Sequence, residues 1–417
     1  MSQVLTDYCP SCVRCDTMRL IHTSLVALLL TACGTSDSPN HAVVRDSAGI
    51  TIVDNGTMVA PTVWTVSAEP TVNIGAMDGA DEYLLNRVAG AFKLGDGRIV
   101  IANGGSAEWR FYDAAGMFLK ASGGHGGGPG ELRALFEVSL LPDDTMVAFD
   151  PAARRADWYD DTGVFVRRTQ VDVGALVEPP FYTEGSHILS DRSLLVRMYE
   201  SEPRPHPDGV YRSPLGFVRV TEDLVVRDTL AWVGSLENYL IHIDDRVVPG
   251  ARPFARRAVE TWGGDYVYVA DTDRYDIYAY QLSTGAHMRI RREVPPVPVT
   301  DADRAEFVES YREFMGRSRR PTANLERWLA AVTYPATKPP IQDLRADRAG
   351  WLWVAETGSR EDSTVTWSVF DTSGRLHAWV ALPVRLTLLD IGDDYILARH
   401  RDELNVEFVR VYTLNKE

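Results

Sequence analysis

The stretch Phe92-Lys-Leu-Gly-Asp-Gly-Arg-Ile-Val-Ile-Ala-Asn103, followed by Trp109-Arg-Phe-Tyr-Asp-Ala-Ala-Gly116, decides the fold. Apolar and polar residues alternate in it, and β-branched and aromatic residues are frequent. Its Asp-Gly pair supplies the positive φ that a tight turn between two strands needs. The pattern therefore predicts a strand, a turn and a second strand. Related patterns recur at 140–163, 266–285 and 351–374, with weaker copies at 193–220 and 395–412.

Six equivalent positions, one in each copy, measure the repeat: Asn103, Asp150, Met198, Asp271, Glu356 and Arg399. The successive spacings are 47, 48, 73, 85 and 43 residues, which is a blade-sized period with two insertions. A single four-stranded sheet cannot bury both of its faces, whereas sheets stacked around an axis form a continuous core. We therefore predict an all-β protein whose residues 49–417 form a six-bladed β-propeller.

The two ends of the chain are predicted to meet in the last blade. The final copy has only three strands and ends near Tyr412, too close to the C-terminus for a fourth. Near the N-terminus, the segment 71–75 and the connector after it parallel the segment 118–122, the expected outer strand of the first blade. We predict that residues 71–74 supply the missing strand, because pairing the chain ends removes open sheet edges.

Two insertions interrupt the repeats. Residues 200–214 are rich in proline and predict a loop within the third blade. Residues 295–340 lie between the fourth and fifth blades, and about 300–334 of them predict a small helical insertion. Thr300 and Asp303 have the spacing of a capping box, and apolar residues then recur on one helix face. The two expected helices could form a lid over one face or pack permanently on the rim.

The repeats resemble those of six-bladed β-propeller proteins related to NHL-repeat domains. The resemblance covers most of residues 50–413. It rests on Gly-Asp-Gly-Arg-Ile-Val at 95–100, Phe-Tyr-Asp at 111–113, Gly-Gly-Gly-Pro-Gly-Glu-Leu at 126–132 and Val-Tyr-Val-Ala-Asp at 267–271. It implies the fold but no particular ligand, because propellers with this signature serve many roles.

The sequence Leu30-Thr-Ala-Cys33 ends the apolar run 20–30 and resembles the lipobox of bacterial lipoproteins. In a lipobox the cysteine receives a diacylglycerol and the upstream residues are removed. The run is far shorter than the roughly 20 residues that span a bilayer as a helix. We expect residues 1–17 to be an extension from a wrong start codon, 18–32 to be the signal peptide, Cys33 to be the lipid anchor and 33–48 to be a flexible tether.

Gly34, directly after the cysteine, resembles a signal for sorting to the outer membrane. We therefore expect a lipid-anchored protein of the bacterial cell envelope that faces the periplasm or the exterior. The net charge of −15 argues against nucleic acid as a partner, because phosphate binding requires a basic surface. The expected partners are the membrane, through Cys33, and an unknown protein or small-molecule ligand. We expect a monomer.

Polar residues at one repeated position, Asn103, Asp150, Asp271 and Glu356, resemble a ring of calcium ligands. Their recurrence instead favours hydrogen bonds from each residue to backbone amides in the turn of its own blade. Residues unique to one blade are better candidates for a channel or ligand-binding site. Glu137 and Asp343 are on expected innermost strands, and Asp390 lies further along its own innermost strand. The other two candidates, His125 and Glu131, are in a glycine-rich connector.

Two functions remain open. The first is an envelope-anchored binding module that binds its ligand on one face of the ring, with no catalytic residue and no cofactor. The alternative is a calcium-dependent lactonase or esterase acting in the central channel, which a similarity to the gluconolactonase and paraoxonase propellers would imply. The sequence contains neither the G-x-S-x-G motif of serine hydrolases nor the H-E-x-x-H motif of zinc proteases.

Overall fold

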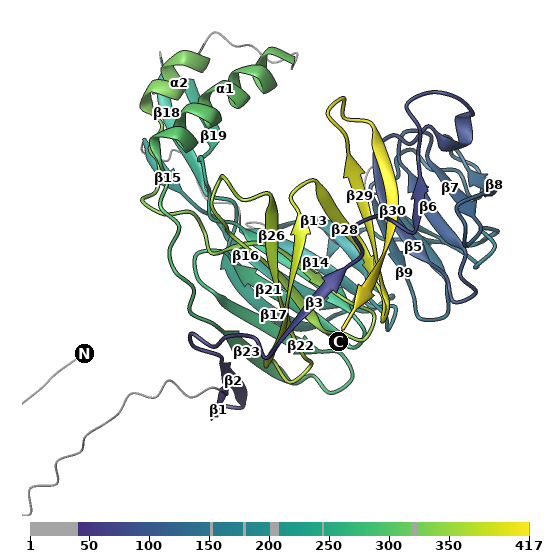
Figure 1. Cartoon of the computed structure of the whole chain (residues 1–417), viewed down its shortest axis with the longest axis horizontal. Helices are drawn as coiled ribbons and strands as arrows, with labels where there is room; N and C mark the ends of the chain where they lie inside the picture. Colours follow the sequence, from purple (N-terminus) through teal and green to yellow (C-terminus); the bar gives the residue numbers. More distant parts are fainter. Residues whose placement is uncertain are drawn as a thin grey trace, which may run out of the picture. The chain divides into compact units, whose positions relative to one another are not determined.

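The computed structural model describes residues 41–150, 153–177, 181–200, 208–243, 246–317 and 324–416 (Figure 1). All described residues belong to one compact unit, Ser38–Glu417. The signal peptide, Cys33 and the upstream extension lie outside the described residues. Within the described part, no helix combines the length and the apolar character needed to cross a membrane.

Four-stranded antiparallel sheets follow one another along the chain, as the repeats predicted. Blade 1 contains β5 (Val88–Lys93), β6 (Ile99–Asn103), β7 (Glu108–Tyr112) and β8 (Phe118–Gly123). Blade 2 contains β9 (Glu137–Leu140), β10 (Met146–Asp150), β11 (Arg155–Tyr159) and β12 (Phe165–Gln170). Blade 3 contains β13 (Phe181–Ile188), β14 (Leu194–Glu200), β16 (Pro214–Val220) and β17 (Val226–Gly234).

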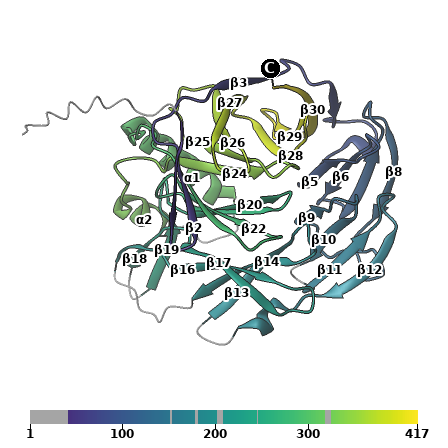
Figure 2. The same cartoon turned by 90° about the horizontal axis from the view of Figure 1, so that it is seen from below.

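The second half of the ring repeats this order. Blade 4 contains β20 (Ala258–Gly263), β21 (Tyr266–Asp271), β22 (Asp276–Gln281) and β23 (His287–Arg291). Blade 5 contains β24 (Ile341–Ala346), β25 (Leu352–Glu356), β26 (Thr364–Phe370) and β27 (Leu376–Pro383). Blade 6 contains β28 (Leu386–Ile391), β29 (Tyr395–Arg401), β30 (Glu407–Asn415) and β4 (Val72–Ile74). Figure 2 shows the blades arranged in a ring, with β5, β9, β20, β24 and β28 toward its centre.

The closing strand is where the sequence placed it. β4 pairs antiparallel with β30, with Val72 opposite Val411 and Ile74 opposite Val409. Ile74 is fully buried in a cluster formed by blades 6 and 1. The two ends of the chain therefore complete the last blade together, which confirms the six-bladed propeller.

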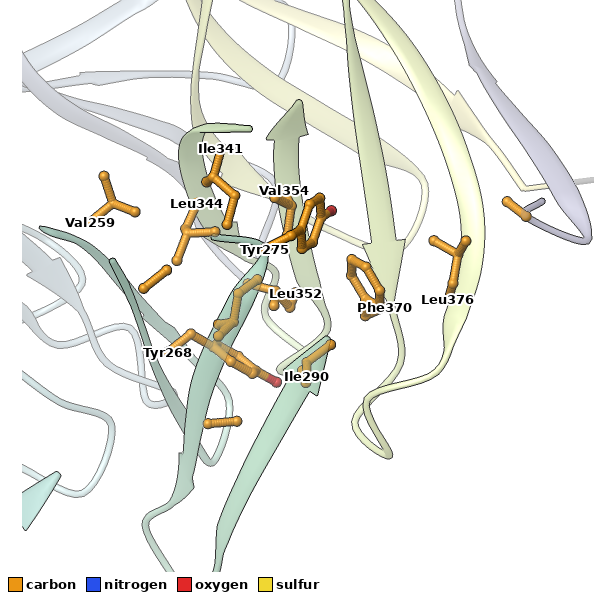
Figure 3. Packing of buried hydrophobic residues seen from close by; sticks show 14 residues of the cluster. Val259, Tyr268, Tyr275, Ile290, Ile341, Leu344, Leu352, Val354, Phe370 and Leu376 are labelled. Atoms are coloured by element: carbon orange, nitrogen blue, oxygen red, sulfur yellow. The ribbon is translucent and has the colours of Figure 1, made fainter. Parts of the chain in front are cut away.

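Six apolar clusters hold the ring together, one between each pair of neighbouring blades. Figure 3 shows the cluster between blades 4 and 5. Tyr275 of blade 4 packs against Phe370 of blade 5, with ring centroids 6.1 Å apart, and both side chains are buried. Because every blade buries both of its faces against a neighbour, the repeated apolar strands form a closed core.

An N-terminal belt, residues 43–74, runs along the outer strands of blades 4, 5 and 6. β1 (Val43–Ser47) and β2 (Ile50–Asp54) form a hairpin, and β2 pairs in parallel with β23. β3 (Thr62–Val66) pairs in parallel with β27 and then meets β30. The flexible tether was expected to extend to residue 48, but Val43–Ser47 forms β1, because the hairpin adds two strands to blade 4.

Two side chains fix the N-terminal belt to blade 5. Trp64, on β3, is 3% exposed, and its ring lies 5.7 Å from that of Trp351 and 5.8 Å from that of Trp353. The buried Asn55 amide donates to the carbonyl oxygen of Gly374 at 3.0 Å, and its Oδ1 accepts from the backbone N–H of Leu376 at 2.8 Å. The belt is therefore an integral part of the propeller.

The insertions form an accessory subdomain. Its three-stranded sheet contains β15 (Gly209–Tyr211), β18 (Asn238–Ile243) and β19 (Arg246–Ala251), and its helices are α1 (Asp301–Arg317) and α2 (Leu325–Ala331). Figure 1 shows the helices and this sheet together, on the opposite side of the ring from β1 and β2. Trp328 of α2 is buried against Tyr239 and Ile241 of β18. The predicted helical pair thus packs on the hairpin β18–β19, which the sequence analysis did not foresee.

The start of α1 follows the predicted capping box. Asp303 accepts hydrogen bonds from the backbone N–H and hydroxyl of Thr300 at 2.9 and 2.8 Å, and the Thr300 hydroxyl accepts from the N–H of Asp303 at 3.2 Å. Lys338 Nζ lies 2.8 Å from Asp303 Oδ1. Burial raises the pKa of Asp303, but the hydrogen bonds from Lys338 and Thr300 outweigh it and lower the pKa to about 2.

Candidate functional site

Charged side chains gather on the innermost strands of blades 2 to 5. Glu137 begins β9, His187 is near the end of β13, and Glu260 is in the middle of β20. Asp343 and Arg345 are on β24. None of these residues recurs at the same position in every blade, in contrast to the apolar residues of the core. We name these five residues, together with Arg197 of β14, the axial cluster.

His187 is the centre of the acidic half of the axial cluster. Its Nδ1 lies 4.0 Å from Glu137 Oε2, and its Nε2 lies 3.9 Å from Glu260 Oε1. Its ring packs on that of Trp262, with centroids 4.2 Å apart. Burial, aided by the positive charge of Arg197, lowers the pKa of His187 to about 3. The imidazole is therefore neutral at physiological pH, although two carboxyl groups flank it.

Glu260 is only 6% exposed and is held by Arg197, whose Nε lies 2.8 Å from Oε1. Burial raises the pKa of Glu260, and the attraction of Arg197 does not fully offset this effect. The negative charge of Asp343 raises the pKa further. Shifted pKa values in a buried group of polar residues from several elements are typical of functional sites.

Asp343 and Arg345 form an ion pair of 3.0 Å between Oδ2 and Nη2, and both side chains are partly exposed. Arg345 also donates from Nε to the carbonyl oxygen of Leu388, on β28 of blade 6, at 3.0 Å. On the other side of β28, Arg399 of β29 donates from Nη1 to the carbonyl oxygen of Val88 in blade 1 at 3.0 Å. Arginines thus connect the innermost strands of blades 5, 6 and 1.

The donor set of the axial cluster does not fit a calcium ion. Calcium takes six to eight oxygen ligands, largely carboxylates. Here Glu260 is bound by Arg197 and Asp343 by Arg345, so a cation would have to displace two guanidinium groups. Within the described ranges, no group of three or more His, Cys, Asp and Glu side chains is arranged to hold a metal ion.

The repeated polar positions mainly bind backbone amides, but several of these amides lie in connectors or in a neighbouring blade rather than in the predicted turn of the same blade. Asn103 accepts from the N–H of Asn86 at 2.8 Å, and Asp150 accepts from the N–H of Arg133 at 3.0 Å. Asp271 accepts from backbone N–H groups at 3.1 and 3.2 Å. Glu356 differs, because it accepts from the side chains of Tyr275, Ser368 and Arg292.

Of the five residues named from the sequence, the structure brings together Glu137 and Asp343. Asp390 instead joins three blades. It accepts from the N–H of Lys93 in blade 1 at 3.0 Å and from the hydroxyl of Tyr395 at 2.8 Å. It also forms a two-pronged ion pair with Arg348, which lies in the turn between β24 and β25 of blade 5. All of these contacts support a structural role.

His125 and Glu131 belong to the connector between blades 1 and 2. His125 is exposed, with Nε2 3.2 Å from the carbonyl oxygen of Gly105. Glu131 Oε2 accepts from the N–H of Gly128 at 2.8 Å and so closes the glycine-rich turn. Neither side chain has a described contact with the axial cluster.

Sequence reasoning missed the other four residues of the axial cluster: His187, Glu260, Arg197 and Arg345. The available signal was a charged or polar residue within an otherwise apolar innermost strand, as in Ala258–Gly263. In blade 3, the weak repeat and the bulge in the pairing of β13 with β14 concealed this signal.

Two cavities lie away from the axial cluster. One of about 420 Å³ lies between the outer parts of blades 1 and 2 and is lined by Lys120, Glu131 and Phe165 among others. Another of about 300 Å³ lies where the accessory subdomain meets blade 4, beside Arg252, Arg256 and Lys338. The first two of these three cations are paired with Glu237 and the third with Asp303.

No protein-family model matches the chain. No curated protein has significant similarity to it. Solved structures do match over most of their length. A protein of Bacteroides fragilis, whose name describes it as exported, has 13% identity and a TM-score of 0.45, and the match covers 88% of this chain and 99% of that one.

A member of the DUF4221 family from Bacteroides vulgatus has 9% identity and a TM-score of 0.47, with 85% of this chain and 99% of that one covered. Regucalcin of Agrobacterium tumefaciens, described as calcium-binding, has 11% identity and a TM-score of 0.37, with 85% and 97% covered. These likenesses concern the fold alone. The six-bladed β-propeller rests on the strand pairing and the six interfaces of this chain.

Proposed function

We propose that this chain is a propeller of the bacterial envelope that binds a small polar ligand at the axial cluster, without catalysis. The observation that carries the proposal is the axial cluster itself. Its residues come from four blades and are not part of the repeat, although burying a charged group such as Glu260 is costly to a fold. A repeat protein that needed only a core would fill these positions with apolar residues.

The chemistry of the axial cluster suits recognition. Carboxylates paired with arginines present acceptors and donors in fixed positions, and such pairs orient ligands by hydrogen bonds. His187, neutral and packed on Trp262, adds a ring nitrogen donor or acceptor between two carboxyl groups. The calcium-dependent hydrolase receives no support from this arrangement, because Arg197 and Arg345 already neutralise two of the carboxylates.

The anchoring part of the proposal rests on Cys33 in its lipobox-like context. The first strand begins at Val43, ten residues later, and ten extended residues span about 35 Å at most. A lipid on Cys33 would therefore hold blade 4 close to the membrane surface. This placement would put the binding face in the periplasm or at the cell exterior.

The anchor is tested by expressing the full chain in a bacterial host with radioactive palmitate. Labelling of the wild-type chain, its sensitivity to globomycin and loss of label in Cys33→Ala are the expected results. A Cys33→Ala chain that remains fully membrane-bound would contradict lipid anchoring.

The binding site is tested by thermal melting of the full chain in detergent with a panel of amino acids and sugar acids. A saturable stabilisation by at least one compound, lost in Asp343→Asn but kept in Asp78→Asn, is expected. Asp78 is an exposed residue of the loop after β4 and serves as the matched control. No stabilisation by any compound would count against an axial binding site. Specific stabilisation by micromolar calcium that Asp343→Asn abolishes would favour the hydrolase instead.

A further inference from the structure

Arg345 and Arg399 approach the same point of the ring from different blades. Arg345 extends from blade 5 and donates from Nε to the carbonyl oxygen of Leu388. The residue before it, Thr387, is directly opposite Arg399 in the pairing of β28 with β29. Directly opposed residues of antiparallel strands have Cα atoms about 4.5–5.5 Å apart. Arg399 also feels the positive charge of Arg345, so both guanidinium groups lie near the innermost strand of blade 6, and we call this place the junction.

Positive charge exceeds negative charge at this junction. Arg345 is paired with Asp343, and Arg401 is paired with Glu407 at 2.6 Å. Arg399 is 3.7 Å from the same oxygen of Glu407, so three arginines share two carboxylates. Burial lowers the pKa of Arg399, and the positive charges of Arg401 and Arg345 lower it further, against the attraction of Glu407.

The guanidinium of Arg399 is also only partly satisfied. It has five N–H donors. Within the described part of the chain it makes one hydrogen bond, to the carbonyl oxygen of Val88. Its Nε is buried and has no hydrogen-bond partner among the described residues. The side chain is nevertheless 19% exposed, so part of it can be reached from solvent. A buried donor without a partner destabilises a fold and calls for an explanation, which a ligand that accepts from it would supply.

We propose that Arg345 and Arg399 recognise an oxyanion, a carboxylate or a phosphate group, on the ligand of the axial cluster. This inference rests on the binding function proposed above and adds the chemical class of the ligand. Guanidinium groups bind both oxyanions through paired N–H donors. The ligand is therefore a small acid.

The test uses the full chain in detergent, with phosphate and acetate as separate probes. Melting temperatures are measured at increasing probe concentration, with sodium chloride holding the ionic strength constant. A saturable rise with one of the two probes is expected, and which probe acts distinguishes a phosphate from a carboxylate ligand. In Arg399→Gln the apparent dissociation constant should rise at least roughly 10-fold. Arg385→Gln removes an exposed arginine just before β28 and should leave binding unchanged.

Two further measurements separate binding from a structural role. Arg399→Lys keeps the charge and should retain part of the response. The probe-free melting temperature of Arg399→Gln should change little, because relief of the repulsion from Arg345 and Arg401 offsets loss of the hydrogen bond to Val88. A marked fall would show that Arg399 has a structural role and would overturn the inference. A saturable response to a probe that persists in Arg399→Gln would also overturn it, and so would the absence of a response to both probes. A panel compound whose binding depends on Asp343 but not on Arg399 would refute this inference while leaving the binding function standing.

Discussion

Trp64 offers the sharpest test of the N-terminal belt. Its side chain is 3% exposed and lies among the rings of Trp351, Trp353 and His377 of blade 5, at centroid distances of 5.7–5.8 Å. Replacing a buried tryptophan by alanine removes these contacts and leaves a cavity, which costs about 3–5 kcal/mol. Because whole domains are stable by about 5–15 kcal/mol, Trp64→Ala should lower the denaturation midpoint clearly.

Val63 is the matched control for this substitution. It is the preceding residue of β3, points to the other face and is 59% exposed, so Val63→Ala should change stability by no more than about 0.5 kcal/mol. Urea unfolding followed by far-ultraviolet circular dichroism measures both variants without relying on tryptophan fluorescence. Limited proteolysis should cut Trp64→Ala first within residues 55–75. Equal midpoints for the two variants would refute the view that the belt is part of the propeller.

Three further predictions concern single sites. The ring protons of His187 should titrate with a pKa well below 5 in NMR spectra. The pKa of His187 in the folded protein, about 3, lies below its value of about 6.5 in the unfolded chain. The unfolded chain therefore binds a proton first as the pH falls, and the folded state loses stability between about pH 6.5 and pH 3. His187→Gln should therefore weaken the acid sensitivity, and a titration near pH 6.5 would contradict the burial. Asp303→Asn should destabilise α1, because the Lys338 ammonium loses its carboxylate partner. Hydrogen exchange should become faster in α1 and α2 and stay unchanged in the propeller strands. Gly163→Ala should destabilise blade 2, because φ is +76° and the new Cβ would meet the Phe111 ring at 2.6 Å, and an unaltered melting temperature would refute this.

The repeated strands and the closure of the ring could be predicted because they depend on local patterns. A strand, a tight turn and a second strand are encoded within about twenty residues, and five of the six blades follow the same order along the chain. β4 was recognisable because it resembles the corresponding segment of blade 1.

The N-terminal belt had no such pattern to reveal it. β1, β2 and β3 are five residues each and match no repeat. β2 and β3 pair with strands more than 200 residues away, and β1 pairs only with β2. The hairpin β18–β19 was concealed for a related reason. Its apolar residues pack on α2, which belongs to a different insertion. The apolar face of each insertion therefore has no partner within the same stretch of sequence.

The candidate site was predicted in part. Glu137 and Asp343 could be found because they are acidic residues on strands that the repeat marks as innermost. Asp390 satisfied the same criterion and proved to bind backbone and side chains of three blades. A sequence shows which residues are near the axis, but whether a carboxylate is already occupied depends on partners such as Arg348, which is 42 residues away in the chain.

The N-terminal belt also orders events during synthesis. Residues 43–74 are synthesised before the strands that they join, which run from β23 to β30. Until β27 and β30 have emerged from the ribosome, β3 and β4 have no sheet to enter, and contacts of such long sequence separation form slowly. Completion of the ring is thus tied to synthesis of β30, and a polypeptide that stops before β27 is left with unpaired strands for a protease to recognise.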